Sequence, residues 1–180
     1  MGEDKSQLVY PKLSREPQRV KLVQLLESSG LGSFLSCRAE QPPSESLFTG
    51  KIIFDREELI GGPGVGILSA HLAHPEVNWL VLACDFPFAS KSAIEKLLQT
   101  YADQKKSVCY RHEDGTIEPL FSIWSTADLQ YFHIQFLAGS KSPKRALEER
   151  GVFSILPLEE KILENINSPR EAAAHAELLK

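Results

Sequence analysis

The sequence predicts one α/β domain of three layers, in which a mostly parallel, Rossmann-like β-sheet lies between two layers of helices. Two observations lead to this fold class. Strand-like apolar segments alternate with segments of helical periodicity, as expected for a sheet with right-handed crossovers. Segment 80–83 is apolar at every position, which indicates a strand buried on both faces by helices. The 180 residues suffice for a single domain over 1–180 with a hydrophobic core.

The first half of the chain is predicted to hold two helices and two strands. In order, we expect a helix over 20–26, strands over 33–37 and 51–54, and a helix over 67–72. Gly30 is placed to end the first helix as a left-handed cap. A proline-containing loop through Pro42 and Pro43 separates the two strands, and a glycine-rich loop over 61–66 precedes the second helix.

The second half is predicted to continue the alternation of strands and helices. We expect a strand that ends before Asp85, a helix over 90–101, strands over 107–110 and 117–123, helices over 126–137 and 143–150, and a strand over 152–156. Asp114-Gly115 favours a hairpin turn between the two middle strands. Ser168-Pro169 opens a capping box, so the chain is expected to end in a helix.

Composition narrows the function classes. Hydrophobic residues make up 42% of the chain and charged residues 24%, which is ordinary for a globular protein. The net charge of −4 indicates no basic surface for nucleic acid, and no apolar run is long enough to span a membrane. No secretory signal follows Met1, and the odd set Cys37, Cys84 and Cys109 indicates reduced thiols in a cytoplasmic protein.

Polar residues at the predicted strand ends form the candidate site. Asp55, the loop over 61–66 and Asp85 all follow strands, and ligands of α/β proteins bind at the carboxyl ends of strands. A carboxylate fixed there can hold a divalent cation, although a turn or helix-capping aspartate explains Asp85 equally well. Asn165 and Asn167 share one face of an extended segment, where asparagines usually serve as turn or cap residues.

The same residues belong to an ordered series of short motifs. They are Met1-Gly2-Glu3-Asp4-Lys5, Asp55, Gly62-Pro63, Ala83-Cys84-Asp85-Phe86-Pro87, Glu118-Pro119-Leu120-Phe121 and Asn165-Ile166-Asn167-Ser168-Pro169. In this order, over nearly the whole chain, they resemble the molybdenum cofactor guanylyltransferases within the nucleotidyltransferase-like, glycosyltransferase-A-type superfamily.

The resemblance implies an Mg²⁺-dependent enzyme that transfers GMP from GTP to a molybdopterin-type cofactor and releases pyrophosphate. GTP and the molybdopterin cofactor are then its ligands, and molybdoenzymes or other proteins of cofactor biosynthesis are its expected partners.

The resemblance also assigns a role to each matching residue. It makes Asp85 the Mg²⁺ ligand and Lys5 the cation that neutralises the triphosphate, although a terminal lysine is ordinarily a solvated charge. Ser36, Asp55 and Gly62 match nucleotide-contacting positions. Asn165 and Asn167 match the metal or acceptor side of the cleft. Lys141, Lys144 and Arg145 are read as a solvated surface, with an acidic acceptor as the alternative.

The chain departs from the family pattern at its first residues. The family signature runs Leu-Ala-Gly-Gly-x-Ser-x-Arg-Met-Gly-x-Asp-Lys, and only its last part is present here. We therefore expect the sheet to lack its first, central strand and the phosphate loop. About five buried residues at roughly 1.5–3 kcal/mol each amount to on the order of 10 kcal/mol, which is comparable to a domain's whole stability.

Two hypotheses account for this departure. In the first, Met1 is an internal methionine of the signature and translation starts upstream. In the second, the chain is a catalytically silent, nucleotidyltransferase-like binding domain. A relative that uses CTP or a sugar-phosphate acceptor is the alternative enzyme.

Overall fold

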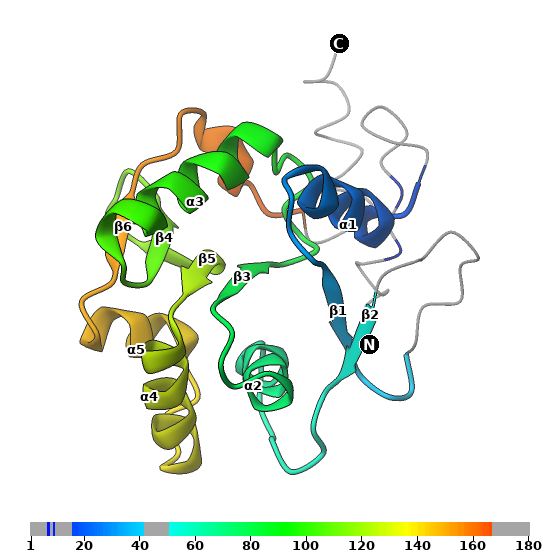
Figure 1. The fold of residues 1–180 in the computed structure, drawn as a ribbon, viewed down its shortest axis with the longest axis vertical. Helices are drawn as coiled ribbons and strands as arrows, with labels where there is room; N and C mark the ends of the chain where they lie inside the picture. The colour runs from blue at the N-terminus through cyan, green and yellow to red at the C-terminus, as the bar shows by residue number, and fades with distance from the viewer. Residues whose placement is uncertain (1–6, 8, 10–15, 42–50, 167–180) are drawn as a thin grey trace.

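The computed structural model describes residues 7, 9, 16–41 and 51–166 (Figure 1). Two candidate site residues, Lys5 and Asn167, lie outside the described residues. So do the loop through Pro42 and Pro43 and the helix expected from Ser168.

The described strands form two sheets, and within each sheet the strands run in the same direction, except for one strand of the larger sheet. β1 (Phe34–Cys37) and β2 (Lys51–Phe54) form a parallel pair. The larger sheet has the order β3 (Trp79–Leu82), β5 (Ile117–Trp124), β4 (Val108–Arg111) and β6 (Phe153–Ile155). In this sheet β5 alone is reversed, because it is antiparallel to both β3 and β4 while β6 is parallel to β4. The predicted mostly parallel α/β sheet is therefore confirmed.

Helices cover both faces of the larger sheet, which confirms the three-layer arrangement. The helices are α1 (Gln18–Ser28), α2 (Gly64–Ala73), α3 (Lys91–Gln104), α4 (Thr126–Leu137) and α5 (Pro143–Glu149). On one face, Leu22 and Ile94 join Phe121 in a core beneath α1 and α3. On the other face, a second core beneath α2, α4 and α5 is centred on Trp124 and Phe132. No helix in the described part of the chain is both long and apolar enough to cross a membrane.

Local sequence signals predicted most ends of the helices and strands correctly. Gly30 follows α1 with a φ of 79°, as expected for a left-handed cap. Ser125 caps α4 by accepting a hydrogen bond from Asp128 N, and the observed helix has the predicted bounds. Two details differ from expectation: α2 begins at Gly64, inside the glycine-rich loop, and a 3₁₀ turn at Glu160–Leu163 was not predicted.

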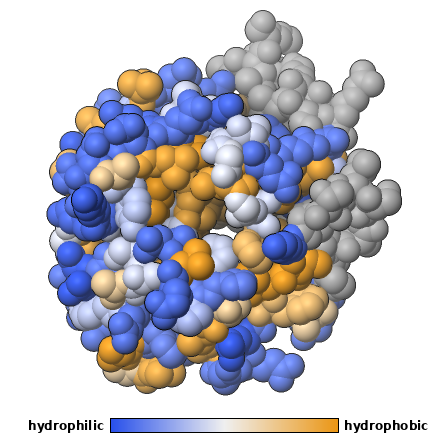
Figure 2. Space-filling model, viewed as in Figure 1, coloured by the Kyte–Doolittle hydropathy of each residue, from blue (hydrophilic) through white to orange (hydrophobic). Residues whose placement is uncertain are grey.

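The prediction that the strand before Asp85 is buried on both faces is confirmed only in part. Leu80 and Leu82 pack against one core and Trp79 and Val81 against the other, so both faces are covered. All four residues of β3 are only half-buried. The reason is the break between the two sheets, since β3 is an edge strand of the larger sheet and β1 is an edge strand of the smaller one. Figure 2 shows the molecule hollowed between these two regions, with hydrophobic side chains around the hollow. An apolar sequence thus forms β3, but no neighbouring strand covers its open edge among the described residues.

Candidate functional site

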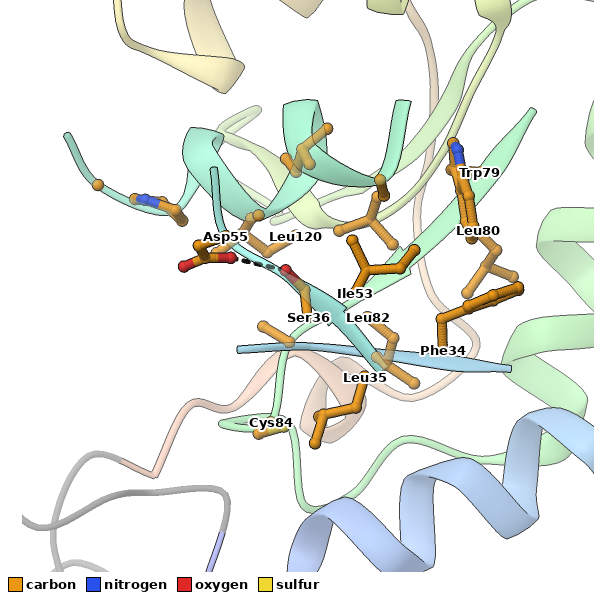
Figure 3. A pocket seen from close by; sticks show the side chains of 17 residues that line it. Phe34, Leu35, Ser36, Ile53, Asp55, Trp79, Leu80, Leu82, Cys84 and Leu120 are labelled. Carbon is orange, nitrogen blue, oxygen red and sulfur yellow. Dashed lines mark hydrogen bonds between the residues drawn. The ribbon is translucent and has the colours of Figure 1, made fainter. Parts of the chain in front are cut away.

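The smaller sheet fixes Ser36 and Asp55 beside each other. β1 and β2 run in register, and the Asp55 amide extends their ladder by donating to the carbonyl of Cys37 at 2.9 Å. The hydroxyl of Ser36 donates to Oδ1 of Asp55, also at 2.9 Å (Figure 3). Ser36 is exposed and Asp55 is half-buried, so the carboxylate is held in position while remaining accessible to a ligand.

The glycine-rich loop brings α2 close to this pair. Gly61 and Gly62 have φ values of 127° and 57°, which glycine adopts without steric cost. In α2, a Cβ added to Gly66 would lie 2.9 Å from Ser36 Oγ and 3.7 Å from Asp55 Oδ1. The absence of a side chain at position 66 therefore lets the helix backbone approach Ser36 and Asp55.

Two contacts hold the loop and helix in place. The backbone amide of Arg56 donates to Ser69 Oγ at 2.9 Å, which joins the segment after Asp55 to α2. Lys141 Nζ donates to the carbonyl of Ile60 and lies 5.2 Å from the ring centroid of Phe136. Lys141, read as a solvated surface residue, therefore anchors the start of the glycine-rich loop, although its amine lies on the exposed side.

A cavity of about 330 Å³ opens beside these residues. It brings together three predicted nucleotide-contacting residues, namely Ser36, Asp55 and Gly62. Apolar side chains from β1, β2 and β3 form much of its wall, as Leu35, Ile53 and Leu82 illustrate in Figure 3, and residues of α2 and β5 complete it. A polar rim over an apolar wall is the usual composition of a small-molecule site.

Asp85 lies just beyond this cavity, in the loop that follows β3. Its neighbour Cys84 lines the cavity. The carbonyl of Asp85 accepts a hydrogen bond from the Ile166 amide at 3.0 Å, so the C-terminal segment runs against this loop. Asn165 is therefore brought beside Asp85, where it is exposed. Two predicted site residues far apart in sequence thus lie on backbone segments that are hydrogen-bonded to each other, while Lys5 and Asn167 lie outside the described residues.

Helix α1 fixes the loop after Asp85. Gln18 Nε2 donates to the carbonyl of Phe86 at 3.1 Å, and Lys21 Nζ donates to the carbonyl of Pro87. Burial lowers the pKa of Lys21. Sequence reasoning missed both residues, because the Gln18 contact spans 68 positions and nothing in the helix sequence signals it.

Glu118 adds a second carboxyl group near Asp85. It lies on β5, where Oε1 accepts a hydrogen bond from the Leu120 amide at 3.0 Å. Burial raises the pKa of Glu118, and the negative charge of Asp85 raises it further. In the sequence, Glu118 belongs to the motif Glu118-Pro119-Leu120-Phe121 and has no predicted role in the site. The two carboxyl groups concentrate negative charge at this end of the sheet.

The donor set at Asp85 suits Mg²⁺ bound together with phosphate. Within the described part of the chain, no three His, Cys, Asp or Glu side chains gather to hold a metal ion. Mg²⁺ needs only one or two carboxylates, because water and substrate phosphate oxygens complete its octahedron. Asp85 supplies one carboxylate at a strand end, and Glu118 adds negative charge nearby. The residues present therefore fit this mode of Mg²⁺ binding.

Comparison with known proteins identifies relatives over nearly the whole chain. A family described as "MobA-like NTP transferase domain" matches residues 1–152. A "Molybdenum cofactor biosynthesis bifunctional protein" of Synechocystis is 32% identical over 175 residues, which are 95% of this chain and 48% of that protein. A "Molybdenum cofactor guanylyltransferase" of Pseudomonas aeruginosa is 30% identical over 146 residues, which are 80% of this chain and 73% of that protein. The chain thus spans about half the length of the Synechocystis relative.

A solved structure shows the same fold. The crystal structure of "Molybdopterin-guanine dinucleotide biosynthesis protein A" from Archaeoglobus fulgidus superposes with a TM-score of 0.75. The alignment covers 97% of this chain and 89% of that one at 19% identity. At this identity the likeness concerns the fold alone.

Proposed function

The chain belongs to the MobA-like NTP transferase family, and on this premise we propose that residues 1–180 form one nucleotidyltransferase domain. Its proposed reaction is transfer of GMP from GTP to a molybdopterin-type cofactor with release of pyrophosphate. One observation carries the proposal: Ser36 and Asp55, fixed to each other at 2.9 Å, line a cavity that continues to Cys84, next to Asp85. This geometry supports a nucleoside end near Asp55 and a phosphate end near Asp85.

Nucleotidyl transfer requires that the two substrates are positioned for attack and that the negative charge of the triphosphate is neutralised. A phosphate oxygen of the acceptor attacks the α-phosphorus of GTP, the bond to the β-phosphate oxygen breaks, and pyrophosphate leaves. Asp55 would accept hydrogen bonds from the nucleoside, and Gly62 and Gly66 would allow its close approach to the backbone. Mg²⁺ held by Asp85 would neutralise phosphate charge when bound. Lys5 would add a second positive charge, and Asn165 and Asn167 would line the metal or acceptor side of the cleft.

The cellular setting follows from the same proposal. We propose a cytoplasmic enzyme whose partners belong to molybdenum cofactor biosynthesis or are molybdoenzymes. The thiols support this setting, because Cys37, Cys84 and Cys109 form no disulfide among the described residues. Burial raises the pKa of Cys109 to about 12, so this thiol is unreactive and serves as a core residue.

Nucleotide titration with the Asp55→Asn variant tests the nucleoside end. Calorimetry in the presence of Mg²⁺ should show that the wild-type chain binds GTP more tightly than CTP. Asp55→Asn should weaken GTP binding by about tenfold, because one charge-assisted hydrogen bond is worth roughly 1.5 kcal/mol. The matched control is Glu57→Gln, an equal change of charge at an exposed residue two positions away, which should bind GTP like the wild type.

Three outcomes would contradict the proposal. Equal affinity for CTP would favour the alternative enzyme. Failure of the wild-type chain to bind either nucleotide would favour a silent domain. Equal weakening of GTP binding by Asp55→Asn and Glu57→Gln would mean that Asp55 acts only through its negative charge and not through a hydrogen bond to the nucleoside.

A further inference from the structure

Asp85 begins a short loop that is held by two distant parts of the chain. We call residues 85–89 the Asp85 loop. On one side of it lies the segment that follows β6. The Ile166 amide of this segment donates to the carbonyl of Asp85 at 3.0 Å. Lys161 Nζ lies 4.4 Å from the ring centroid of Phe88, so the same segment contacts the loop at a second point.

On the other side, α1 binds the two residues that follow Asp85. Gln18 Nε2 donates to the carbonyl of Phe86 at 3.1 Å. Lys21 Nζ donates to the carbonyl of Pro87. Gln18 and Lys21 have the spacing i, i+3, which places two side chains on the same face of a helix. One face of α1 therefore binds two successive carbonyls of the Asp85 loop.

Packing alone does not fix this loop. The Phe86 side chain is fully buried in the core, but a cavity of about 250 Å³ opens behind the residues that follow it. Pro87, Phe88 and Ala89 line this cavity together with Lys21. A close-packed interior would leave no such space for the backbone to move into. The hydrogen bonds from α1 are therefore what opposes a shift of the loop toward the cavity.

Gln18 is a costly residue at this position if it only fills space. Its side chain is 1% exposed, and its Oε1 atom is buried without a hydrogen-bond partner among the described residues. A buried acceptor without a partner is destabilising, and an unbranched apolar side chain of similar length would avoid this cost. What Gln18 gains in return is its hydrogen bond to the carbonyl of Phe86. The benefit of the amide thus lies in the position of the Asp85 loop.

The position of the loop determines where the Asp85 carboxylate can lie. Phe86 is bonded directly to Asp85, so a shift of its carbonyl moves the backbone of Asp85 as well. Mg²⁺ demands near-ideal octahedral geometry with ligands at about 2.0–2.1 Å. A site of this kind needs its ligands held to within roughly 0.5 Å. A loop that relaxes into the cavity would therefore bind Mg²⁺ less well.

We propose that Gln18 and Lys21 are positioning residues for Mg²⁺. They hold the Asp85 loop so that the carboxylate of Asp85 meets the ion that is bound together with the nucleotide. Neither side chain is itself a ligand, because each acts through a backbone carbonyl. The inference rests on the proposed function, since it takes Asp85 as the Mg²⁺ ligand.

A purely structural role of these two residues predicts a different result. Loss of a structural contact would deform the nucleotide cavity as a whole and weaken GTP binding with and without Mg²⁺. Loss of a positioning contact would weaken only the part of GTP binding that depends on Mg²⁺. The gain in GTP affinity on addition of Mg²⁺ therefore distinguishes the two roles.

Calorimetry with GTP on the full chain, in Mg²⁺ and in a chelator, measures this gain. Gln18→Met removes the amide at nearly constant side-chain length. We expect its GTP affinity in chelator to equal that of the wild type and its Mg²⁺-dependent gain to fall by about tenfold, as expected for one lost hydrogen bond. The matched control is Gln24→Met, the same change at an exposed position of α1, which should leave the gain unchanged.

Lys21 provides a second variant and a conservative replacement. Lys21→Met should also reduce the Mg²⁺-dependent gain, whereas Lys21→Arg keeps a cationic donor and should recover most of it. Circular dichroism and melting temperatures establish which variants are folded. Lys21 is only half-buried, so Lys21→Met still decides the question if Gln18→Met does not fold.

Amide hydrogen exchange reports the position of the loop without any nucleotide or metal. The Ile166 amide donates to the carbonyl of Asp85, so its exchange should become about tenfold faster in Gln18→Met than in the wild type. Gln24→Met should exchange there like the wild type. Exchange at Val152, whose amide donates to the carbonyl of Leu147, should be the same in all variants.

The outcomes separate this inference from the proposed function. A wild-type chain whose GTP affinity does not rise with Mg²⁺ would contradict the role of Asp85, and the inference would fail with it. If the wild type shows the gain, three results would overturn the inference alone. They are an unchanged gain in Gln18→Met and Lys21→Met, an equal loss of gain in Gln24→Met, and unchanged exchange at Ile166 in Gln18→Met.

Discussion

The two sheets differ sharply in how well they are covered. In the larger sheet, β4 is buried over three of its four residues, and helices lie on both faces. In the smaller sheet, Ile53 is the only buried residue of β2, while Ile52 and Phe54 are 37% and 49% exposed. The candidate nucleotide residues Ser36 and Asp55 belong to this thinly covered sheet. These candidate binding residues thus lie in the less densely packed of the two sheets, so stability and binding should respond separately to mutation.

The largest expected effect on stability comes from the same truncation, isoleucine to alanine, made once beside each sheet. Ile94 in α3 is fully buried in the core of the larger sheet, so Ile94→Ala should lower the free energy of unfolding by about 2–5 kcal/mol. Ile52→Ala in β2 removes the same atoms from a partly exposed site and should cost less than about 1 kcal/mol. Urea unfolding followed by circular dichroism measures both. Equal costs would mean that the two sheets are equally important to the core.

A smaller effect is expected from the hydrogen-bond network around Asp128. Oδ2 of Asp128 accepts from Ser107 at 2.5 Å and from Ser125 at 2.9 Å, and Oδ1 accepts from Arg150 Nε at 2.7 Å. Burial acts to raise the pKa of Asp128, but these hydrogen bonds outweigh it and hold the pKa below the ordinary value of 3.8. Asp128→Asn should therefore cost about 2 kcal/mol at pH 7.

The lowered pKa of Asp128 also predicts how its contribution to stability changes with pH. Because the folded-state pKa of Asp128 is lowered, its stabilising effect is present above pH 3.8 and is lost as the pH falls through the folded-state pKa. The stability difference between wild type and Asp128→Asn should accordingly shrink in acid. Glu113→Gln, an equal charge change at an exposed residue, is the control. A difference that stays constant from pH 7 to pH 3 would rule out the ionised carboxylate as the cause.

The smallest effect on stability is expected at Gly66, in the thinly covered region. Gly66→Ala gains up to about 1 kcal/mol of helix propensity but places a Cβ 2.9 Å from Ser36 Oγ. We expect a net change in stability below about 1 kcal/mol and a loss of GTP affinity of about tenfold, because Ser36 and Asp55 must shift. Gly32→Ala is the control, since an added Cβ there meets nothing within 4 Å. An unchanged GTP affinity in Gly66→Ala would show that GTP binding does not depend on the close approach of α2 to Ser36 and Asp55.

Local sequence patterns predicted the helices and strands. They did not predict the contacts between residues that lie far apart in the sequence. The helical periodicity over 126–137 coincides with α4, so the bounds of that helix were readable from the sequence. The burial of β3 depends on which strand lies next to it, and the composition of 80–83 does not contain this information. In the site, the resemblance to a family identified Ser36 and Asp55, whereas Gln18 acts through a fold contact 68 residues away. The structure brings Ser36 and Asp55 together, but their roles, like those of Lys5 and Asn167, stay predictions.

The contact between Lys141 and the glycine-rich loop has an evolutionary consequence. A Cβ at Gly61 would lie 2.8 Å from Cδ of Lys141, the side chain that donates to the carbonyl of Ile60. Gly61 also has a φ of 127°, which other residues rarely adopt. A lineage that replaces Gly61 must therefore move the lysine and reshape the turn together. Positions 61 and 141 are 80 residues apart, yet they should change as a pair.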